Sequence, residues 1–452
     1  MKKLLLWNIV LAAILLMVSC PQASVQNLSP RTDPYEGLEP NTFWALNVAA
    51  NYYYTVDAAL LAEGEKCLVW AEKSEGVSVA EGKAIAHEYD KNIYDKIVGT
   101  FGSPAIMASG DVDGNGKLIL LLLDIKDGFS GSGPYTAGYF YSNDLFESGY
   151  SNGSDMIYVD TYPSKLRTPE SYATIAHELQ HFINYTTRTR VLDGTSGMDT
   201  WIDEGLSAAA EYVYLGEHNR ERVAQFTLSE TVRQGNTFFV WGNLPNSLLD
   251  EYSTVYLFFQ WLRIQSGGTE IYKRIIESPY SDYRAVTGAI SGAFAAGLGT
   301  TDWETTLRSW FAANYLNSPE GLYGYHGELP ELKVYALGGA TQRLRPGEGV
   351  YSIADSSGSL PSSGGPNIKY AGLRERSAAG SPPEDPGVNL SALYPKGRLL
   401  TFNGNKQKYG GGETGLLTGE DGESIPQFPA SGRSAGDSWI IDARDIMGRQ
   451  DR

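Results

Sequence analysis

Two histidines four residues apart, with an acid directly after the first, are the side chains of this chain whose spacing best suits catalysis. They are His177 and His181, and the acid is Glu178. On a helix, residues four apart lie on one face, so both imidazoles can reach the same metal ion. Glu178 would then lie beside that ion, where a carboxylate can take a proton from metal-bound water. Because the chain contains only five histidines, the pattern predicts a catalytic zinc centre rather than a helix that carries two histidines by chance.

The residues before this pentapeptide predict the helix that holds it. Thr168, Pro169 and Glu170 form a helix-start signal, because Thr can cap, Pro fits the first helical position and Glu suits the positive end of the helix dipole. Apolar residues then recur with helical spacing as far as Ile183, which makes one buried stripe. The histidines fall beside the stripe, so we expect the helix to pack into a core and to show both imidazoles to a cleft.

A catalytic zinc ion also needs a third protein ligand and an open position for water. The zincin class with three histidines is excluded, because Asn184 and Thr187 stand where its signature would continue. A glutamate on a following helix is the other common solution, and Glu204 opens such a helix. Asp203 is the alternative ligand, although both acids could instead only stabilise the first turn of their helix. Glu211, two turns further along, is a candidate hydrogen-bond partner of a ligand.

If a metal-activated water attacks a carbonyl group, the oxyanion that forms needs a hydrogen-bond donor besides the metal. Tyr252, at the start of an aromatic-rich helix, is predicted to be this donor and so the second catalytic residue beside Glu178. Tyr256 on the same helix and His326 remain alternatives. The chain contains 29 tyrosines, so the sequence does not decide among these candidates.

These motifs resemble those of the hyicolysin-type neutral zinc metallopeptidases, within the gluzincin group. The resemblance rests on His177-Glu-Leu-Gln-His181 and on Trp201-Ile-Asp-Glu-Gly-Leu-Ser207. It extends from residue 41 to residue 327 through further matching stretches at 111–117, 137–140, 154–159 and 310–315. It implies one catalytic zinc ion, endopeptidase activity on protein or peptide substrates, and secretion.

The elements that must position these residues form two halves. Apolar and aromatic runs predict strands within 41–70, at 117–125 and at 156–160, with a helix over 79–98. Later periodic stretches predict helices over 252–264, 269–277, 285–296 and 303–316. We therefore expect an α+β protein with a sheet-bearing N-terminal half and a helical C-terminal half around a cleft. The resemblance implies a zincin-like layout, in which the strand at 156–160 lies at the sheet edge and pairs with an extended substrate.

The N-terminus predicts a bacterial lipoprotein. Two lysines precede an apolar run that ends at Ser19-Cys20, and the run is shorter than the roughly 20 residues of a membrane span. Cys20 is therefore expected to carry lipid and to hold the protein on the outer or cytoplasmic membrane of the cell envelope, outside the cytoplasm. Ordinary secretion and a retained anchor are the alternatives. The predicted organisation is a signal peptide (1–19), a tether (20–40), a metallopeptidase domain (41–327) and a C-terminal extension (328–452).

Within that extension, a Ser-, Gly- and Pro-rich stretch at 355–385 predicts a linker or disorder, and residues 388–402 predict two short strands. The formal net charge of −17 argues against nucleic acid as a partner and against adhesion to anionic lipid by charge. Cys67, the second of two cysteines, is expected to be a small buried side chain. A monomer is assumed, because the sequence does not address the oligomeric state.

One acidic turn stands apart from the zinc motif. Asp111, Asp113 and Asn115 alternate with glycines before an apolar strand, as the oxygen ligands of a calcium loop do. The acidic twelfth residue of an EF-hand is missing, because Leu122 occupies that position. A tight turn that feeds the strand is therefore the favoured interpretation, and a calcium site is the alternative.

Together these observations predict a lipid-anchored zinc endopeptidase that hydrolyses peptide bonds through a metal-activated water. The rival hypothesis is a catalytically silent surface lipoprotein, an adhesin or scaffold, on the same fold. A complete ligand set with a general base argues against this rival, because a binding module needs neither. A zincin that cleaves a non-peptide amide is a third possibility.

Overall fold

The computed structural model describes residues 35–132, 135–194, 197–236, 241, 248–336, 344–353, 360, 367–373, 388–389, 398–404, 417–418, 424–425 and 438–442. The chain forms two compact units, Met1–Gly37 and Leu38–Arg452, and the fold below is that of the second. The predicted signal peptide, the lipidated Cys20 and most of the predicted tether lie outside the described residues. Within the described part of the chain, every helix is too short or too polar to cross a membrane.

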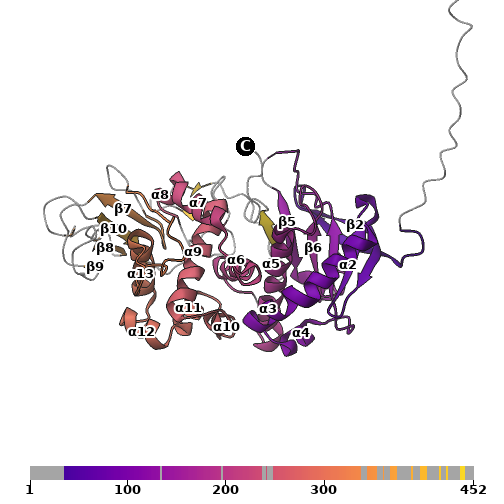
Figure 1. Cartoon of the computed structure of the whole chain (residues 1–452), viewed down its shortest axis with the longest axis horizontal. Helices are drawn as coiled ribbons and strands as arrows, with labels where there is room; N and C mark the ends of the chain where they lie inside the picture. The colour runs from indigo at the N-terminus through magenta and orange to yellow at the C-terminus, as the bar shows by residue number, and fades with distance from the viewer. Residues whose placement is uncertain are drawn as a thin grey trace, which may run out of the picture. The chain divides into compact units, whose positions relative to one another are not determined.

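A seven-stranded sheet forms the N-terminal half (Figure 1), in the order β1-β2-β3-β4-β6-β5-β13. β3, β4 and β6 run parallel to one another, and the remaining pairs in this sheet are antiparallel. β4 is buried at every residue, as its unbroken apolar run predicts for a central strand. The strands of this sheet are β1 (Pro40–Asn47), β2 (Tyr52–Glu63), β3 (Cys67–Glu72), β4 (Leu118–Leu123), β5 (Thr136–Tyr141), β6 (Met156–Asp160) and β13 (Ser438–Asp442).

The strand predicted at 156–160 is present as β6, but its predicted place at the sheet edge is wrong. β6 lies between β4 and β5, and β13 pairs with the outer side of β5. The error has a topological cause: the chain makes β5 first and then inserts β6 between β5 and β4. Among strands β1 to β6, β5 is therefore the outermost on the side of the sheet where β13 pairs.

One face of the sheet is covered by helices. α2 packs on β2 and β3, and α5 packs on β5 and β6. The opposite face closes on its own core of alternate strand residues, among them Trp70, Leu121 and Tyr158. The helices of this half are α2 (Val79–Glu88), α3 (Tyr94–Phe101), α4 (Pro104–Gly110) and α5 (Pro169–Thr186), and a π-helical turn (Tyr89–Ile93) joins α2 to α3.

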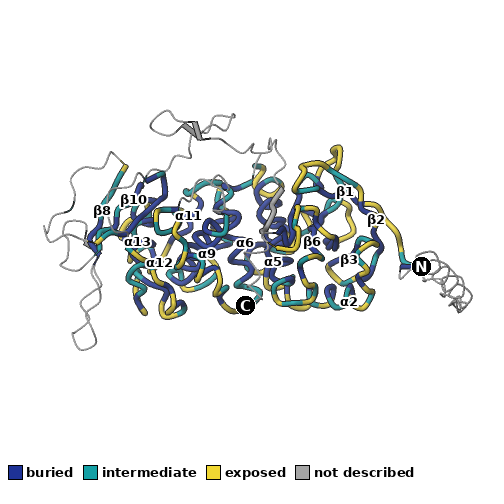
Figure 2. Tube along the Cα trace, turned by 90° about the horizontal axis from the view of Figure 1, so that it is seen from above, coloured by how far each residue is buried: buried dark blue, intermediate teal, exposed yellow. Residues whose placement is uncertain are grey.

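The C-terminal half is helical, as predicted. α6 packs against α5, and α9 packs against α6, so the three form a continuous layer that is buried along much of its length (Figure 2). The helices are α6 (Thr200–Leu215), α7 (Arg220–Leu228), α8 (Glu230–Arg233), α9 (Leu248–Ser266), α10 (Glu270–Ile276), α11 (Tyr283–Ala289), α12 (Gly292–Leu298) and α13 (Trp303–Leu316). The single helix predicted over 285–296 is wrong, because the backbone is extended at Ile290 and at Ser291. These two residues separate α11 from α12.

A four-stranded sheet in the order β7-β10-β8-β9 follows α13. Its strands are β7 (Gly349–Ile353), β8 (Ile368–Leu373), β9 (Val388–Asn389) and β10 (Arg398–Asn403), and a separate hairpin joins β11 (Leu417–Thr418) to β12 (Ser424–Ile425). The two short strands predicted within 388–402 are present as β9 and β10. β8 lies inside the stretch predicted as a linker, most of which is outside the described residues. Phe311 of α13 contacts Phe402 and accepts a hydrogen bond at its carbonyl from Tyr351, so this sheet is anchored on α13.

Candidate metal centre

The helix that carries the pentapeptide begins where its sequence predicts. Thr168 caps α5 by accepting a hydrogen bond from the Ser171 backbone, Ser171 returns a bond to the Thr168 backbone, and Pro169 is the first helical residue. This reciprocal cap fixes the start of the helix. His177, Glu178 and His181 all lie on α5 and are fully buried. The expected display of both histidines to a cleft is therefore wrong, because α6 packs along α5 and covers the polar face of the helix.

α6 brings Glu204 to the two histidines. Trp201 anchors the start of α6 in the core against Phe258 and Trp303. Gly205 allows α9 to approach, because a Cβ at this position would lie 2.4 Å from the Phe259 ring. α6 is thereby held with Glu204 pointing back at α5.

The three candidate ligands converge on one point. Glu204 Oε2 lies 3.4 Å from His177 Nε2 and 3.7 Å from His181 Nε2. Ligand atoms held about 2.0–2.1 Å from a tetrahedral zinc ion are separated by roughly 3.3 Å. His177 Nε2 and Glu204 Oε2 are buried and make no hydrogen bond within the described residues. Buried polar atoms are normally satisfied, so the spacing, the burial and the nitrogen and oxygen donors all fit a zinc ion.

The second nitrogen of each imidazole is held by a carboxylate. Glu211 Oε1 lies 2.7 Å from His177 Nδ1, and Asp203 Oδ2 lies 2.7 Å from His181 Nδ1. Carboxylates in this position orient a ligating histidine and leave its other nitrogen to the metal. Glu211 therefore occupies the partner position that the sequence suggested. Asp203, considered as an alternative ligand, instead faces the far side of His181 and also accepts a hydrogen bond from Asn184.

The protonation of these groups follows from burial and from their acidic neighbours. Burial lowers the pKa of His177 to about 3, so this imidazole is neutral, as a metal ligand must be. Burial also opposes protonation of His181, but the Asp203 carboxylate outweighs it and raises the pKa of that imidazole. Burial raises the pKa of Glu178 well above its usual range, and Glu204 and Asp203 add to this shift. A divalent cation would offset the negative charge that these acids concentrate here.

The Glu178 carboxylate packs closely against a glycine of strand β5. Gly138 of β5 lies directly opposite, and a Cβ there would come within 3.2 Å of Glu178 Oε1 and 2.9 Å of the Tyr158 carbonyl. A glycine inside a strand often marks such a close approach. This was the available sequence signal for Gly138, which was not predicted as part of the site.

Tyr252 is the oxyanion candidate that the structure places beside the histidines. Its ring on α9 is 6.4 Å from the His177 ring, between centroids. Tyr256 lies one turn further on, and its hydroxyl bonds instead to His218 and to the Asn219 backbone. His326 is exposed and bonds to the Gly321 carbonyl.

Arg222 of α7 joins the site and was missed in the sequence. It pairs with Glu211, with Nη2 2.7 Å from Oε1, while its guanidinium lies 5.1 Å from the centre of the Tyr252 ring. It thus links the partner of His177 to the oxyanion candidate. Local sequence spacing does not predict this contact, because Arg222 and Glu211 lie on different helices that are brought together by tertiary packing.

The sequence comparison bears on the family. The chain is 31% identical over 293 residues to the neutral metalloprotease ShpI of Staphylococcus hyicus, a match that covers 63% of this chain and 65% of the relative. The chain is therefore similar in sequence to a neutral metalloprotease. The resemblance predicted from the motifs is thereby confirmed. The chain matches just under two thirds of that relative's length. No protein-family model matches the chain.

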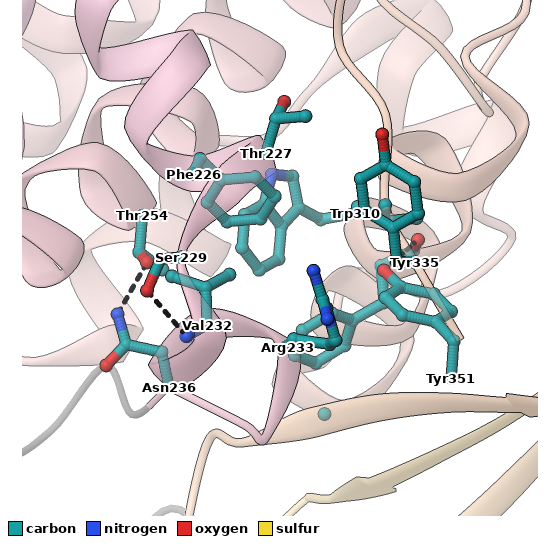
Figure 3. Close-up of a pocket in the computed structure, with 13 residues that line it drawn as sticks. Phe226, Thr227, Ser229, Val232, Arg233, Asn236, Thr254, Trp310, Tyr335 and Tyr351 are labelled. Carbon is teal, nitrogen blue, oxygen red and sulfur yellow. Dashed lines mark hydrogen bonds between the residues drawn. The ribbon is translucent and has the colours of Figure 1, made fainter. Parts of the chain in front are cut away.

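A pocket elsewhere in the structure does not involve the candidate metal centre. Figure 3 shows Phe226 and Trp310 next to each other, with Arg233 between them and the pair Tyr335 and Tyr351. None of the residues that line the pocket is a candidate ligand or Glu178. The residues for which the sequence predicts chemistry therefore lie in the helix-borne centre and not in this pocket.

Proposed function

We propose that this protein is a zinc-dependent endopeptidase that hydrolyses peptide bonds of protein substrates. The proposal rests on the convergence of three candidate ligands, because Glu204 Oε2 lies 3.4 Å from His177 Nε2 and 3.7 Å from His181 Nε2. Glu178 lies next to His177 on α5, the helix that carries both histidines. The similarity to a neutral metalloprotease supports the same activity. The finer assignment to the gluzincin group with a zincin-like layout belongs to this proposal.

Zinc held by His177, His181 and Glu204 would supply a Lewis acid and lower the pKa of a water ligand toward about 7. The Glu178 carboxylate accepts a proton from the attacking water and passes it to the leaving amine nitrogen. The Tyr252 hydroxyl donates a hydrogen bond to the oxygen that gains negative charge. Glu211 and Asp203 hold the two imidazoles in the tautomer that leaves Nε2 free to bind metal.

Access to Glu178 involves β5. Gly138 places this strand directly against the Glu178 carboxylate, and an extended peptide can bind a protein by adding a strand to an exposed sheet edge. The outer side of β5 is paired with β13 in the structure. A substrate that pairs with β5 therefore takes the position that β13 holds.

The proposal is tested by Glu178→Gln, which keeps the shape of the side chain but removes the base. We expect this variant to bind one zinc ion per chain, measured by elemental analysis, and to hydrolyse casein at less than about a thousandth of the wild-type rate. Glu170→Gln makes the same change in the first turn of α5 and serves as the matched control. Casein hydrolysis by Glu178→Gln at the wild-type rate would contradict the mechanism.

Wild-type protein that binds zinc but cleaves neither casein nor a peptide library would favour the silent surface lipoprotein. Cleavage of amides other than peptides would favour the third possibility. A zinc chelator should abolish casein hydrolysis, and added zinc should restore it.

We also propose that lipid on Cys20 anchors the protein on the bacterial cell envelope, outside the cytoplasm. The support is sequence alone: a basic start, a short apolar run and a cysteine that ends it. Cys20→Ser should abolish incorporation of radioactive palmitate and release the protein from the membrane fraction. Membrane-bound, palmitate-labelled Cys20→Ser would refute the assignment.

A further inference from the structure

Three carboxylates from two separate segments meet at one end of the seven-stranded sheet. Asp111 and Asp113 lie in the loop between α4 and β4, and Asp155 directly precedes β6. β4 and β6 are parallel neighbours, and the Ile119 backbone donates a hydrogen bond to the Asp155 carbonyl over 2.9 Å. This pairing sets the starts of both strands side by side. Each of the three acids offers a carboxylate oxygen within 4.8 Å of the others.

Asp155 is the buried member of this cluster, and one of its carboxylate oxygens lacks a hydrogen-bond partner among the described residues. It is only 3% exposed, and its Oδ1 makes no hydrogen bond within the described residues, nor does Oδ1 of Asp111. Burial, together with Asp113 and Asp111, raises the pKa of Asp155 to about 7. A buried carboxylate is strongly disfavoured unless a cation or a hydrogen-bond network compensates it.

The protein itself supplies no cation to the cluster among the residues described. None of the ion pairs in the described part of the chain involves Asp111, Asp113 or Asp155. The lysine of the loop, Lys117, is directed elsewhere, because its ammonium bonds to Glu63 and to the Gly64 carbonyl. The charge of three neighbouring acids is therefore left for an external cation.

The loop itself is shaped to present these acids. Gly114 and Gly116 have φ values of 73° and 74°, which glycine adopts readily. Asn115 Oδ1 accepts a hydrogen bond from the Lys117 backbone over 2.7 Å. Asn115, considered in the sequence as a calcium ligand, therefore stabilises the turn, and Asp155 takes its place in the cluster.

We propose that Asp111, Asp113 and Asp155 together bind one Ca²⁺ ion. An all-oxygen set suits a hard cation and not zinc. Three carboxylates from a dedicated protein cage favour Ca²⁺ over Mg²⁺, which usually keeps several waters and takes one or two carboxylates. Carboxylates bound through both oxygens, with water on the exposed side at Asp113, complete the six to eight oxygen ligands that Ca²⁺ takes.

The bound ion ties the loop after α4 to β6. β6 is the last strand before α5, which carries the candidate zinc ligands. None of the three calcium ligands belongs to the zinc centre, so the ion acts on stability and not on the chemical step. The inference stands independently of the proposed peptidase activity.

The test is a Ca²⁺ titration by calorimetry of the full chain, freed of metal on a chelating resin and reloaded with zinc alone. Glu178→Gln is the background, so that the protein cannot digest itself. We expect one Ca²⁺ per chain with a Kd below about 1 mM. Ca²⁺ at about a hundred times its Kd should raise Tm by about 4 °C, the shift expected for a domain of this size.

Three variants separate binding from folding. Asp155→Asn should abolish the calcium heat, yet its Tm in zinc alone should equal or exceed that of the background protein, because the substitution removes a buried carboxylate that no cation of the described residues offsets. Asp113→Asn, at the exposed side, should weaken binding about tenfold. Asp95→Asn, on the exposed surface of α3, removes one negative charge elsewhere and should change neither quantity.

The assignment is overturned if 10 mM Ca²⁺ produces neither heat nor a change in Tm. It is overturned equally if Asp155→Asn binds Ca²⁺ as the background does, or if Mg²⁺ binds more tightly than Ca²⁺. The third result would show a divalent site of a different kind.

Discussion

Two clusters in this protein each bring three potential metal ligands together, and they differ in nearly every other respect. His177, His181 and Glu204 come from two packed helices and are almost fully buried. Asp111, Asp113 and Asp155 come from a loop and a strand end, and range from exposed to buried. The first set mixes nitrogen and oxygen donors, whereas the second offers oxygen alone. Ligand type and rigidity therefore separate a centre suited to zinc chemistry from one suited to a stabilising hard cation.

Their surroundings differ in the same direction. In the helical cluster, Glu211 and Asp203 hold the outer nitrogens of the histidines, so carboxylates of the protein orient both imidazoles. In the loop cluster, hydrogen bonds from the Asn115 and Gly116 backbones hold one oxygen each of Asp113 and Asp111. Backbone groups of a turn therefore orient the carboxylates of the loop cluster, whereas neighbouring carboxylate side chains orient the histidines of the helical cluster. If the two clusters are separate devices, damage to one should leave the other intact.

The largest expected effect tests that independence at the helical cluster. Glu204→Gln removes a charged ligand, so zinc content should fall from about one ion per chain toward zero and kcat/KM should fall on the order of a thousandfold or more. Elemental analysis and casein hydrolysis measure the two quantities. The rise in Tm caused by Ca²⁺ should persist in this variant. Loss of the calcium response together with zinc would show that the clusters are coupled.

A smaller effect is expected from the carboxylate behind a ligand. Asp203→Asn weakens the hold on His181 Nδ1 without touching the metal, so zinc affinity should drop about 10- to 100-fold. Competition with a chromophoric chelator measures this affinity directly. Glu217→Gln, an exposed acid just beyond the end of α6, is the matched control and should leave it unchanged. If Asp203→Asn instead abolishes zinc binding as Glu204→Gln does, Asp203 is itself a ligand.

The smallest effect concerns calcium and the chemical step. Protein loaded with zinc alone and protein loaded with zinc and Ca²⁺ should hydrolyse casein at initial rates within about twofold of each other at 25 °C. Their half-lives at elevated temperature should differ, because a ligand that binds only the folded state stabilises it. A large difference in initial rate at 25 °C would mean that the loop site takes part in catalysis.

The contrast also explains what the sequence could predict. His177, Glu178 and His181 lie within one helical turn, so local spacing alone brings them together. Glu204 could be predicted because it lies near the start of the next helix, in a recognisable sequence setting. Asp155, by contrast, stands far along the chain from Asp111 and meets it only through the parallel pairing of β4 with β6. Asn115, which is closer to Asp111 in sequence, was considered as the third calcium ligand, but the long-range strand pairing brings Asp155 to the cluster in its place.

The same limit applies to the fold. Many strand and helix positions followed from periodicity, although β5 was not predicted and the predicted helix over 285–296 is two helices. The start of α5 followed from its capping residues. The order of strands did not, because β6 is inserted between β4 and β5 by a pairing that no local pattern records. The contact of Arg222 with Glu211 has the same origin. Periodicity therefore predicted many of the elements, and capping predicted one helix boundary, whereas the lateral arrangement of the elements required the structure.

The pairing of β13 with β5 has a consequence for handling the protein. An unpaired strand edge readily recruits the edge of another molecule, and β13 shields the outer edge of β5 from such association. A preparation in which the chain has been clipped before residue 438 bares that edge. Clipped material should therefore scatter more light on storage than intact material at equal concentration, and its aggregates should be held by backbone pairing at β5.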